Sequence, residues 1–239
     1  MPPSQIRDRL PEGCWKHEGV AVVVGGGPSL RAFDWPKLHD PGAKPYGRRF
    51  RTIAINRAFQ DAPTADVFFT EDARVVSRFG PTEAFQKFNG VKLLHLLDEG
   101  YGPEIIPYLG QLTLIHKKRE DKHWSRQWDE GLAVSSNSAV GAINVATILG
   151  ARTIFLLGLD CRSEGPTIQN YHEGSYPKDW AVGSGTLADY RSDFEHWVAL
   201  NLEKERVKAY NVVHPSSEST ISCWEKITFD EFYGVLREL

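Results

Sequence analysis

The sequence predicts an α/β fold: a Rossmann-like, mostly parallel sheet flanked by helices, with a small lid region. Short runs of β-branched and apolar residues recur along the chain, as expected for strands that are buried on both faces of a sheet. Helix signals separate several of these runs, and a strand–helix–strand rhythm favours parallel strands joined by right-handed crossovers. Polar residues or glycines follow the strands directly, which is where ligands bind in open α/β sheets.

The composition is typical of a globular protein and excludes several classes. Of the 239 residues, 41% are hydrophobic and 25% are charged, and the length suits a single domain over 1–239. The net charge of -3 argues against a globally basic nucleic-acid-binding protein but allows a local basic patch. Cys14, Cys161 and Cys223 are too widely spaced for a disulfide framework or a zinc site. Without an apolar run long enough for a membrane span or signal peptide, we expect a cytoplasmic protein with no membrane partner.

The first predicted strand, 21–24, leads into a glycine turn made of Gly25, Gly26, Gly27, Pro28 and Ser29. Backbone N–H groups of such a turn can approach a ligand closely because no Cβ atoms intervene. Pro28 suits the first turn of a helix, and the Ser29 hydroxyl can bond a free amide or a ligand oxygen. Strand, turn and helix N-terminus together predict an anion site, usually for phosphate. A tight turn without a ligand is the alternative, although three successive glycines exceed what a turn needs.

The glycine spacing matches neither of the two common nucleotide fingerprints. A P-loop has Lys-Ser/Thr after its last glycine, where this chain has Pro28-Ser29. The dinucleotide pattern G-x-G-x-x-G would place its third glycine at Leu30. We therefore expect a nucleotide, but neither NAD nor the mechanism of a P-loop NTPase.

The remaining elements follow in order. Residues 1–17 suggest a loose polar lead-in, and Pro, Gly and basic residues in 36–51 suggest a loop. Apolar runs predict further strands at 52–55, 66–70, 92–97, 112–115, 153–157 and 207–213. Polar side chains follow three of these strands: Asn56, then Glu71 and Asp72, then Asp160.

Three helices have clear start signals. Capping hydroxyls in 135–138 predict a helix over 139–149, and Gly150 is placed to end it. Thr186 is placed to cap a long amphipathic helix that extends to Val198. Thr228 and Glu231 fit a capping box at the start of a C-terminal helix.

Two segments have no helix or strand period. Residues 161–185 contain Gly, Pro, Tyr, His and Trp and suggest a lid or active-site loop. The segment 116–128 interleaves aromatic with basic residues, and its cations are Lys117, Lys118, Arg119, Lys122 and Arg126. It is either a solvated lid or a surface facing the acceptor, with cations for phosphates and the rings of Trp124 and Trp128 for stacking.

Four stretches in this order resemble one known superfamily: V-V-V-G-G-G-P-S-L at 22–30, the strand ending at Asn56, the helix 136–149 followed by I-F-L-L-G-L-D, and N-x-x-H-P-x-S at 211–217. This superfamily contains compact bacterial sialyltransferases that use CMP-sialic acid. It also contains archaeal 6-hydroxymethylpterin diphosphokinase-like proteins and many phage proteins. The resemblance covers roughly residues 20 to 220.

The resemblance implies a set of nucleotide-binding residues. Gly25, Gly27, Pro28 and Ser29 would hold the phosphate and ribose, and Gly26 stands where the sialyltransferases have Asn. Asn56 would bond the sugar or base, and Ser136, Asn137 and Ser138 would line the pocket. His172, in the loop after the G-x-D strand, would be the general base, a role that suits histidine because an ordinary imidazole has a pKa near working pH, and Tyr171 could stabilise a departing phosphate. The alternative for His172 is an ordinary surface histidine.

The implied function is that of a nucleotide-sugar-dependent glycosyltransferase without an essential metal. One form of it is a phage-encoded enzyme acting on modified DNA bases or a glycan, with Lys118, Arg119, Lys122, Trp124 and Arg126 contacting the acceptor. One alternative is an ATP-dependent pyrophosphoryl transferase with Mg²⁺ on Asp72 and Asp160. Another is a non-catalytic nucleotide-binding module. The sequence leaves open the donor base, the sugar, the acceptor and the oligomeric state.

Overall fold

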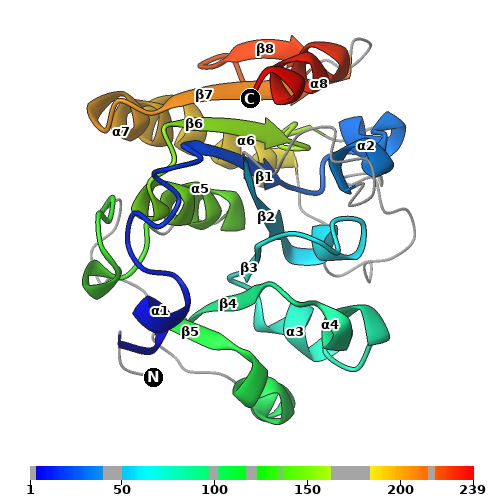
Figure 1. The fold of residues 1–239 in the computed structure, drawn as a ribbon, viewed down its shortest axis with the longest axis vertical. Coiled ribbons are helices and arrows are strands. Elements are labelled where there is room, and N and C mark those ends of the chain that lie inside the picture. Colours follow the sequence, from blue (N-terminus) through cyan, green and yellow to red (C-terminus); the bar gives the residue numbers. More distant parts are fainter. Residues whose placement is uncertain are drawn as a thin grey trace.

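The chain forms a single parallel sheet. A computed structural model describes residues 4–39, 50–96, 102–116, 123–133, 135, 137–162, 184–214 and 219–239. In these residues the strands are β1 (Val20–Val24), β2 (Arg51–Ile55), β3 (Val67–Thr70), β4 (Val91–Leu96), β5 (Thr113–His116), β6 (Thr153–Leu157), β7 (Lys208–Val213) and β8 (Glu225–Thr228). Their order is β5-β4-β3-β2-β1-β6-β7-β8, and every neighbouring pair is parallel (Figure 1). The predicted α/β fold class is therefore confirmed.

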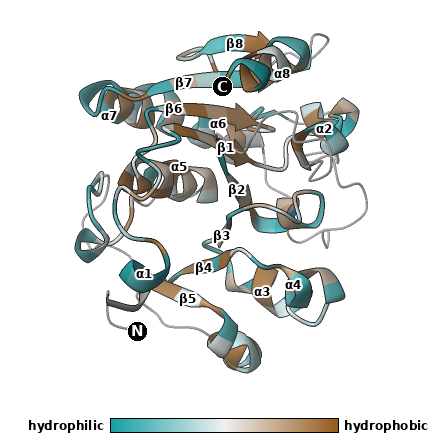
Figure 2. Cartoon of the chain, in the orientation of Figure 1, coloured by the Kyte–Doolittle hydropathy of each residue, from teal (hydrophilic) through white to brown (hydrophobic). Residues whose placement is uncertain are grey.

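Both faces of the sheet are covered, which explains why the strands are continuous apolar runs. All five residues of β1 are buried: Ala21 and Val23 join the hydrophobic cluster on one face, and Val22 joins the cluster on the other. Figure 2 shows the same distribution, with the central strands β1 and β6 strongly hydrophobic.

Helices form a layer on each face. One face carries α1 (Ser4–Arg9), α5 (Ser138–Leu149) and a long helix made of α6 (Ser184–Asp193), a π-helical turn (Phe194–Val198) and α7 (Ala199–Lys204). The other face carries the 3-10 helices Pro28–Ala32, Asn56–Gln60 and Pro103–Gln111 with α2 (Trp35–His39), α3 (Ala73–Phe79), α4 (Glu83–Lys87) and α8 (Phe229–Glu238). A further 3-10 turn spans Trp128–Glu130. Among the described helices, none combines the length and apolar character needed to cross a membrane.

The strand order creates one switch point in the sheet. The chain proceeds outward from β1 through β2, β3 and β4 to β5, and then returns to place β6 on the other side of β1. Ligands of open α/β sheets bind outside the carboxyl ends of the strands at such a point. A ligand site is therefore expected at the residues that follow β1 and β6.

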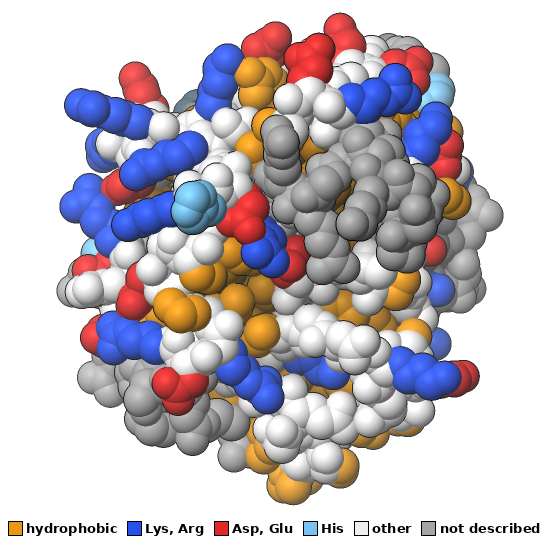
Figure 3. All heavy atoms as spheres, viewed as in Figure 1, with side chains coloured by type: hydrophobic (Ala, Val, Ile, Leu, Met, Phe, Trp, Pro, Cys, Tyr) orange, Lys and Arg blue, Asp and Glu red, His pale blue; other side chains and the backbone are white. Residues whose placement is uncertain are grey.

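The opposite, amino edge of the sheet is rich in cations. Four exposed cations lie next to the starts of β6 and β7: Arg152, Lys204, Arg206 and Lys208. In the space-filling view, Lys and Arg side chains gather on the side of the molecule that carries α7 (Figure 3). The basic surface seen there is thus remote from the switch point.

Several predicted boundaries are confirmed. Asn137 caps α5 by accepting a 2.9 Å hydrogen bond from Ala139 N–H, and Gly150 ends the helix in the left-handed region with φ 104°. Thr228 and Glu231 form the predicted capping box at the start of α8.

Other predictions are wrong. The supposed lead-in contains α1, and its Ile6, Leu10 and Trp15 are buried in the core. The supposed loop 36–51 contains most of α2, and β8 was missed, because both elements are too short for a visible period. Thr186 does not cap its helix, which already begins at Ser184.

Candidate functional site

The glycine turn is fitted to the end of β6. Gly25 N–H donates to Leu157 O at 2.8 Å, and Gly27 N–H donates to Gly158 O at 2.7 Å, so both bonds extend the β1–β6 ladder beyond the strands. A Cβ atom on Gly27 would lie 2.6 Å from Gly158 O, which real Cβ atoms essentially never do. Close approach of two strand ends therefore explains both glycines without a ligand. Gly26, between them, is only half-buried.

The contact is reciprocal, because the β6 side also needs a glycine. Gly158 has φ +64°, and a Cβ atom on it would lie 2.8 Å from Leu30 Cγ and 3.1 Å from Gly27 N. A larger residue in either turn would push the two strand ends apart. The turn after β1 and the turn after β6 thus pack tightly against each other at the switch point.

A buried carboxylate links the two turns. Ser29 N–H donates to Asp160 Oδ2 at 2.8 Å, and Asp160 is only 1% exposed. The helix that follows the turn is a five-residue 3-10 helix, Pro28–Ala32. The predicted phosphate position at the Ser29 amide is therefore already occupied by a negative group. The Ser29 hydroxyl is buried and has no hydrogen-bond partner among the described residues.

Asn56 directly follows β2, beside the glycine turn, in an unusual conformation. Its φ is +52°, a left-handed value that Asn tolerates better than most residues. Its Oδ1 accepts a 2.7 Å hydrogen bond from Thr70 Oγ1, a fully buried hydroxyl at the end of β3. Within the described part of the chain, no residue accepts a hydrogen bond from Asn56 Nδ2. Backbone strain of this kind clusters at functional sites.

The α5 start and Asp72 have local roles as helix caps. Asn137 uses its side chain as the α5 cap, Ser138 is half-buried in the first turn, and Ser136 lies outside the described residues. Asp72 caps α3 through Arg74 N–H at 2.9 Å and pairs with the Arg74 guanidinium at 2.7 Å. Within the described ranges, no group of three or more His, Cys, Asp or Glu side chains could hold a metal ion. Asp72 and Asp160, the suggested Mg²⁺-binding pair, thus both form hydrogen bonds to other groups of the protein.

The structure adds polar groups at this edge that were not assigned to the site from the sequence. Glu71, directly after β3, contacts His95 of β4, and Tyr190 of α6 lies within electrostatic range of Glu71. Burial raises the pKa of the Tyr190 hydroxyl, and Coulombic interactions with Cys161, Glu71 and Asp189 raise it further. Glu71 carried a signal, since it is polar and follows a strand. His95 carried none, because it lies inside a strand.

The segment 123–133 corrects the predicted acceptor surface. Trp124 and Trp128 are only 8% and 3% exposed, and Trp128 Nε1 donates to Leu10 O at 2.8 Å. Trp124 packs edge-on against Trp197 at a centroid distance of 6.1 Å. Rings buried in this way cannot stack on a base or sugar, so this part of the prediction is wrong.

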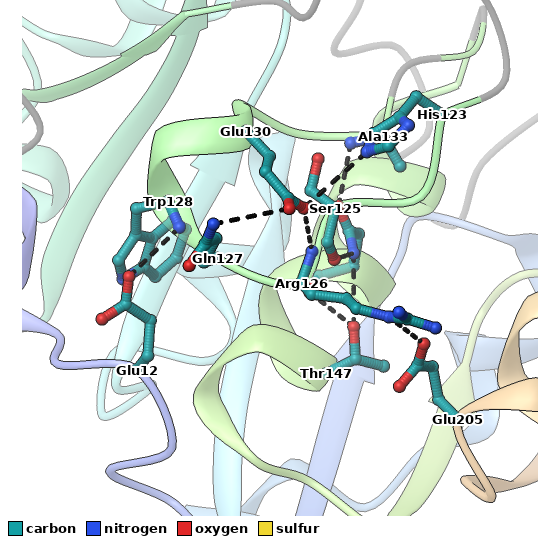
Figure 4. A network of polar contacts seen from close by, with 11 residues as sticks. Glu12, His123, Ser125, Arg126, Gln127, Trp128, Glu130, Ala133, Thr147 and Glu205 are labelled. Atoms are coloured by element: carbon teal, nitrogen blue, oxygen red, sulfur yellow. Dashed lines mark hydrogen bonds and ion pairs between the residues drawn. The ribbon is translucent and has the colours of Figure 1, made fainter.

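A polar network fixes the same segment to the core (Figure 4). Asn144 of α5 accepts from Ala133 N–H at 2.8 Å and donates to Ser125 O at 2.7 Å. Arg126 pairs with Glu205 at 2.7 Å, next to the start of β7 at the amino edge. Arg126 therefore lies at the wrong edge of the sheet for an acceptor site beside the glycine turn.

Several candidate residues lie outside the described residues. These are the proposed base His172, its neighbour Tyr171, and the cations Lys117, Lys118, Arg119 and Lys122. The suggested lid 161–185 is described only at its two ends, up to Arg162 and from Ser184. The catalytic assignment therefore remains a prediction.

Comparisons with known proteins identify shared folds. No protein-family model matches the chain, and no curated protein sequence matches it. The sialyltransferase CstII from Campylobacter jejuni, in complex with the substrate analogue CMP-3FNeuAc, aligns with TM-score 0.53 and 13% identity over 87% of this chain and 85% of that chain. The MAf glycosyltransferase from Magnetospirillum magneticum AMB-1 aligns with TM-score 0.55 and 13% identity, covering 98% of this chain but 42% of that one. The chain thus shares its fold with two glycosyltransferases.

Proposed function

We propose that this chain is a nucleotide-sugar-dependent glycosyltransferase whose donor binds at the carboxyl edge of the sheet, where β6, β1, β2 and β3 end. The observation that carries the proposal is the strained Asn56, whose amide donor has no acceptor among the described residues and lies beside the two packed turns at the β1–β6 switch point. The fold shared with two glycosyltransferases, one of them crystallised with CMP-3FNeuAc, supports it.

The donor approaches the glycine turn at Gly26, the half-exposed glycine of the three. The Ser29 N–H is already bonded to Asp160, and the negative charge of that carboxylate disfavours a phosphate next to the turn, so an uncharged part of the nucleotide faces the turn. Asn56 Nδ2 donates to the base or sugar. Ser136, Asn137 and Ser138 line the far side of the pocket, with Pro28 and Ser29 at its floor.

His172 is the proposed base of the transfer. It takes the proton of the acceptor hydroxyl as the new bond forms between that oxygen and the anomeric carbon. The bond from the anomeric carbon to the phosphate oxygen breaks, and Tyr171 stabilises the departing nucleotide phosphate. A histidine in this role typically contributes about 10²–10⁴-fold to the rate.

Fewer residues remain as candidates for contacting the acceptor than the sequence alone predicts. Trp124 is buried and Arg126 lies at the amino edge, which leaves the charges of Lys118, Arg119 and Lys122. We propose an anionic acceptor, either a glycan or a phage-modified base on DNA. A cytoplasmic location is part of the same proposal and is supported by Cys14, Cys161 and Cys223, which are all free thiols.

A ligand screen tests the proposal. Thermal unfolding is measured with CMP, UMP, AMP, GMP, ATP and nucleotide sugars, with and without Mg²⁺. A ligand present at 100-fold over its Kd raises the stability by about 2.7 kcal/mol. Stabilisation by a nucleotide sugar without Mg²⁺ is expected. Stabilisation by ATP with Mg²⁺ alone would favour the pyrophosphoryl transferase, and binding without turnover would favour the non-catalytic module.

A further inference from the structure

The carboxyl edge also holds a buried carboxylate–imidazole pair. Glu71 directly follows β3, and His95 lies in the neighbouring strand β4. His95 Nδ1 is 3.1 Å from Glu71 Oε1, and the exposed fractions of the two side chains are 0% for His95 and 11% for Glu71. His95 Nε2 is buried without a hydrogen-bond partner among the described residues. The contact with Glu71 is thus the single polar contact that the described residues give to this ring.

The first turns of α5 confine Glu71 on its other side. Gly141 is the fourth residue of α5, and a Cβ atom on it would lie 2.7 Å from Glu71 Oε1 and 2.6 Å from Phe69 Cζ. A residue with a Cβ atom here would have to displace the Glu71 carboxylate and the Phe69 ring. The partial positive charge at a helix N-terminus also favours a negative group there. His95 and α5 together therefore hold Glu71 Oε1 in one place.

The second oxygen of the carboxylate is available to a ligand. Glu71 Oε2 accepts no hydrogen bond from any described residue, although the side chain keeps a small exposed fraction. The hydroxyl of the half-buried Tyr190 on α6 is neutral at physiological pH, and burial raises its pKa further above the ordinary value. A fixed carboxylate and a neutral hydroxyl suit the hydroxyl groups of a ligand, whereas the charge on Glu71 repels a phosphate.

We propose that Glu71 is the sugar-binding carboxylate of this site, and that its Oε2 accepts a hydrogen bond from a hydroxyl of the sugar to be transferred. His95 is a positioning residue: it holds Oε1 and does not touch the ligand. The inference rests on the proposed function and assigns the sugar to the end of β3, next to the nucleotide at β1 and β2. Hydrogen bonds to an ionised group are about twice as strong as neutral ones, so we expect this contact to contribute strongly to the affinity for the sugar.

The test compares nucleotide sugars with their parent nucleotides. Calorimetric titration gives Kd for CMP and CMP-3FNeuAc, and for UDP and UDP-N-acetylglucosamine, with wild type and variants. For each pair, the ratio of the Kd of the parent nucleotide to the Kd of the nucleotide sugar gives the affinity that the sugar adds. Glu71→Gln is expected to reduce this added affinity at least about 10-fold, with the affinity for the parent nucleotide unchanged. Glu83→Gln, a control on the exposed surface of α4, leaves both unchanged.

Two His95 variants separate positioning from packing. His95→Leu is expected to lose the added sugar affinity as Glu71→Gln does. His95→Asn, whose amide can donate from the place of Nδ1, is expected to restore most of it. Equal losses for nucleotide and nucleotide sugar in every His95 variant, with a lower unfolding midpoint, would mean a purely structural pair and overturn the inference. If His95→Leu does not fold, the isosteric Glu71→Gln decides.

The outcomes distinguish this inference from the proposed function. Binding of a parent nucleotide, with the same added sugar affinity in wild type and Glu71→Gln, overturns the role of Glu71 and leaves the proposed function standing. Failure of every nucleotide and nucleotide sugar to bind the wild-type protein overturns both.

Discussion

Ser29 and Asp160 are 131 positions apart in the sequence, and the backbone N–H of Ser29 donates a 2.8 Å hydrogen bond to Asp160 Oδ2. The bond joins the turn after β1 to the turn after β6, which are the two strand ends that define the switch point. Both residues are buried, so the amide has no water as a substitute partner.

This relationship predicts different effects for two substitutions of Asp160. Asp160→Ala leaves the Ser29 N–H buried and unpaired, which is expected to cost about 1–3 kcal/mol of unfolding free energy. Asp160→Asn keeps an oxygen acceptor and is expected to lose less. Urea unfolding of both variants measures the difference, and equal stabilities for Ala and Asn would contradict the importance of the bond.

Gly27 is predicted to be required for the fold as well as for any ligand. A Cβ atom there would lie 2.6 Å from Gly158 O and would also overlap Asp160 Oδ2. Gly27→Ala is therefore expected to lower the unfolding free energy by about 1–3 kcal/mol, as overpacking does. Gly110→Ala is the matched control, because a Cβ atom on Gly110 meets nothing within 4 Å. A Gly27→Ala protein as stable as Gly110→Ala would refute the close fit of the two turns.

Asn56 allows stability and ligand binding to be separated. Asn56→Asp keeps the oxygen that accepts from Thr70 Oγ1 and tolerates the left-handed backbone, but it replaces the Nδ2 donor with an acceptor. We expect the fold to be retained and nucleotide-sugar affinity to fall at least about 10-fold. Asn56→Ala should lose stability as well, since it leaves the buried Thr70 hydroxyl without this partner. Thermal unfolding with and without ligand measures both effects, and unchanged affinity in Asn56→Asp would remove Asn56 from the site.

His172→Ala is predicted to lower kcat at least about 10²-fold while Kd for the donor stays nearly unchanged, because a general base acts in the transition state. Steady-state rates and donor titration measure the two quantities separately. Tyr171→Phe serves as the companion variant, with a smaller loss of kcat expected. Transfer at the original rate in His172→Ala would exclude it as the base. A reaction that strictly needs Mg²⁺ and is lost in Asp72→Asn would favour pyrophosphoryl transfer.

Lys118 and Lys122 test the anionic acceptor. If DNA is the acceptor, binding should weaken steeply with salt, and Lys118→Glu with Lys122→Glu should reduce the slope of log K against log salt by about 1–2. Arg126→Gln is the control, since Arg126 pairs with Glu205 at the amino edge and should leave the slope unchanged. No DNA affinity of the wild-type protein at low salt would assign the acceptor to a glycan or a small molecule.

Local sequence signals were sufficient to predict the parallel sheet and most element boundaries. Buried strands such as β1 and β6 are continuous apolar runs, and the caps at Asn137 and Thr228 depend on residues only two or three positions away. The same signals identified Asn56 as a polar residue at a strand end, where the structure places it.

What the sequence could not provide are contacts between distant segments. It could not tell whether Trp124, among cations, faces solvent or the core, because that depends on packing against Trp197. It could not pair Ser29 with Asp160, or Glu71 with His95, because the two members of each pair belong to different segments that only the folded sheet brings together. The sequence by itself determined the sheet, the glycine turn and the polar residues that follow the strands, since these depend on short-range propensity and burial. Only the tertiary structure decided which of those polar groups are already bonded and which have no partner among the described residues, since that depends on which strand ends lie side by side.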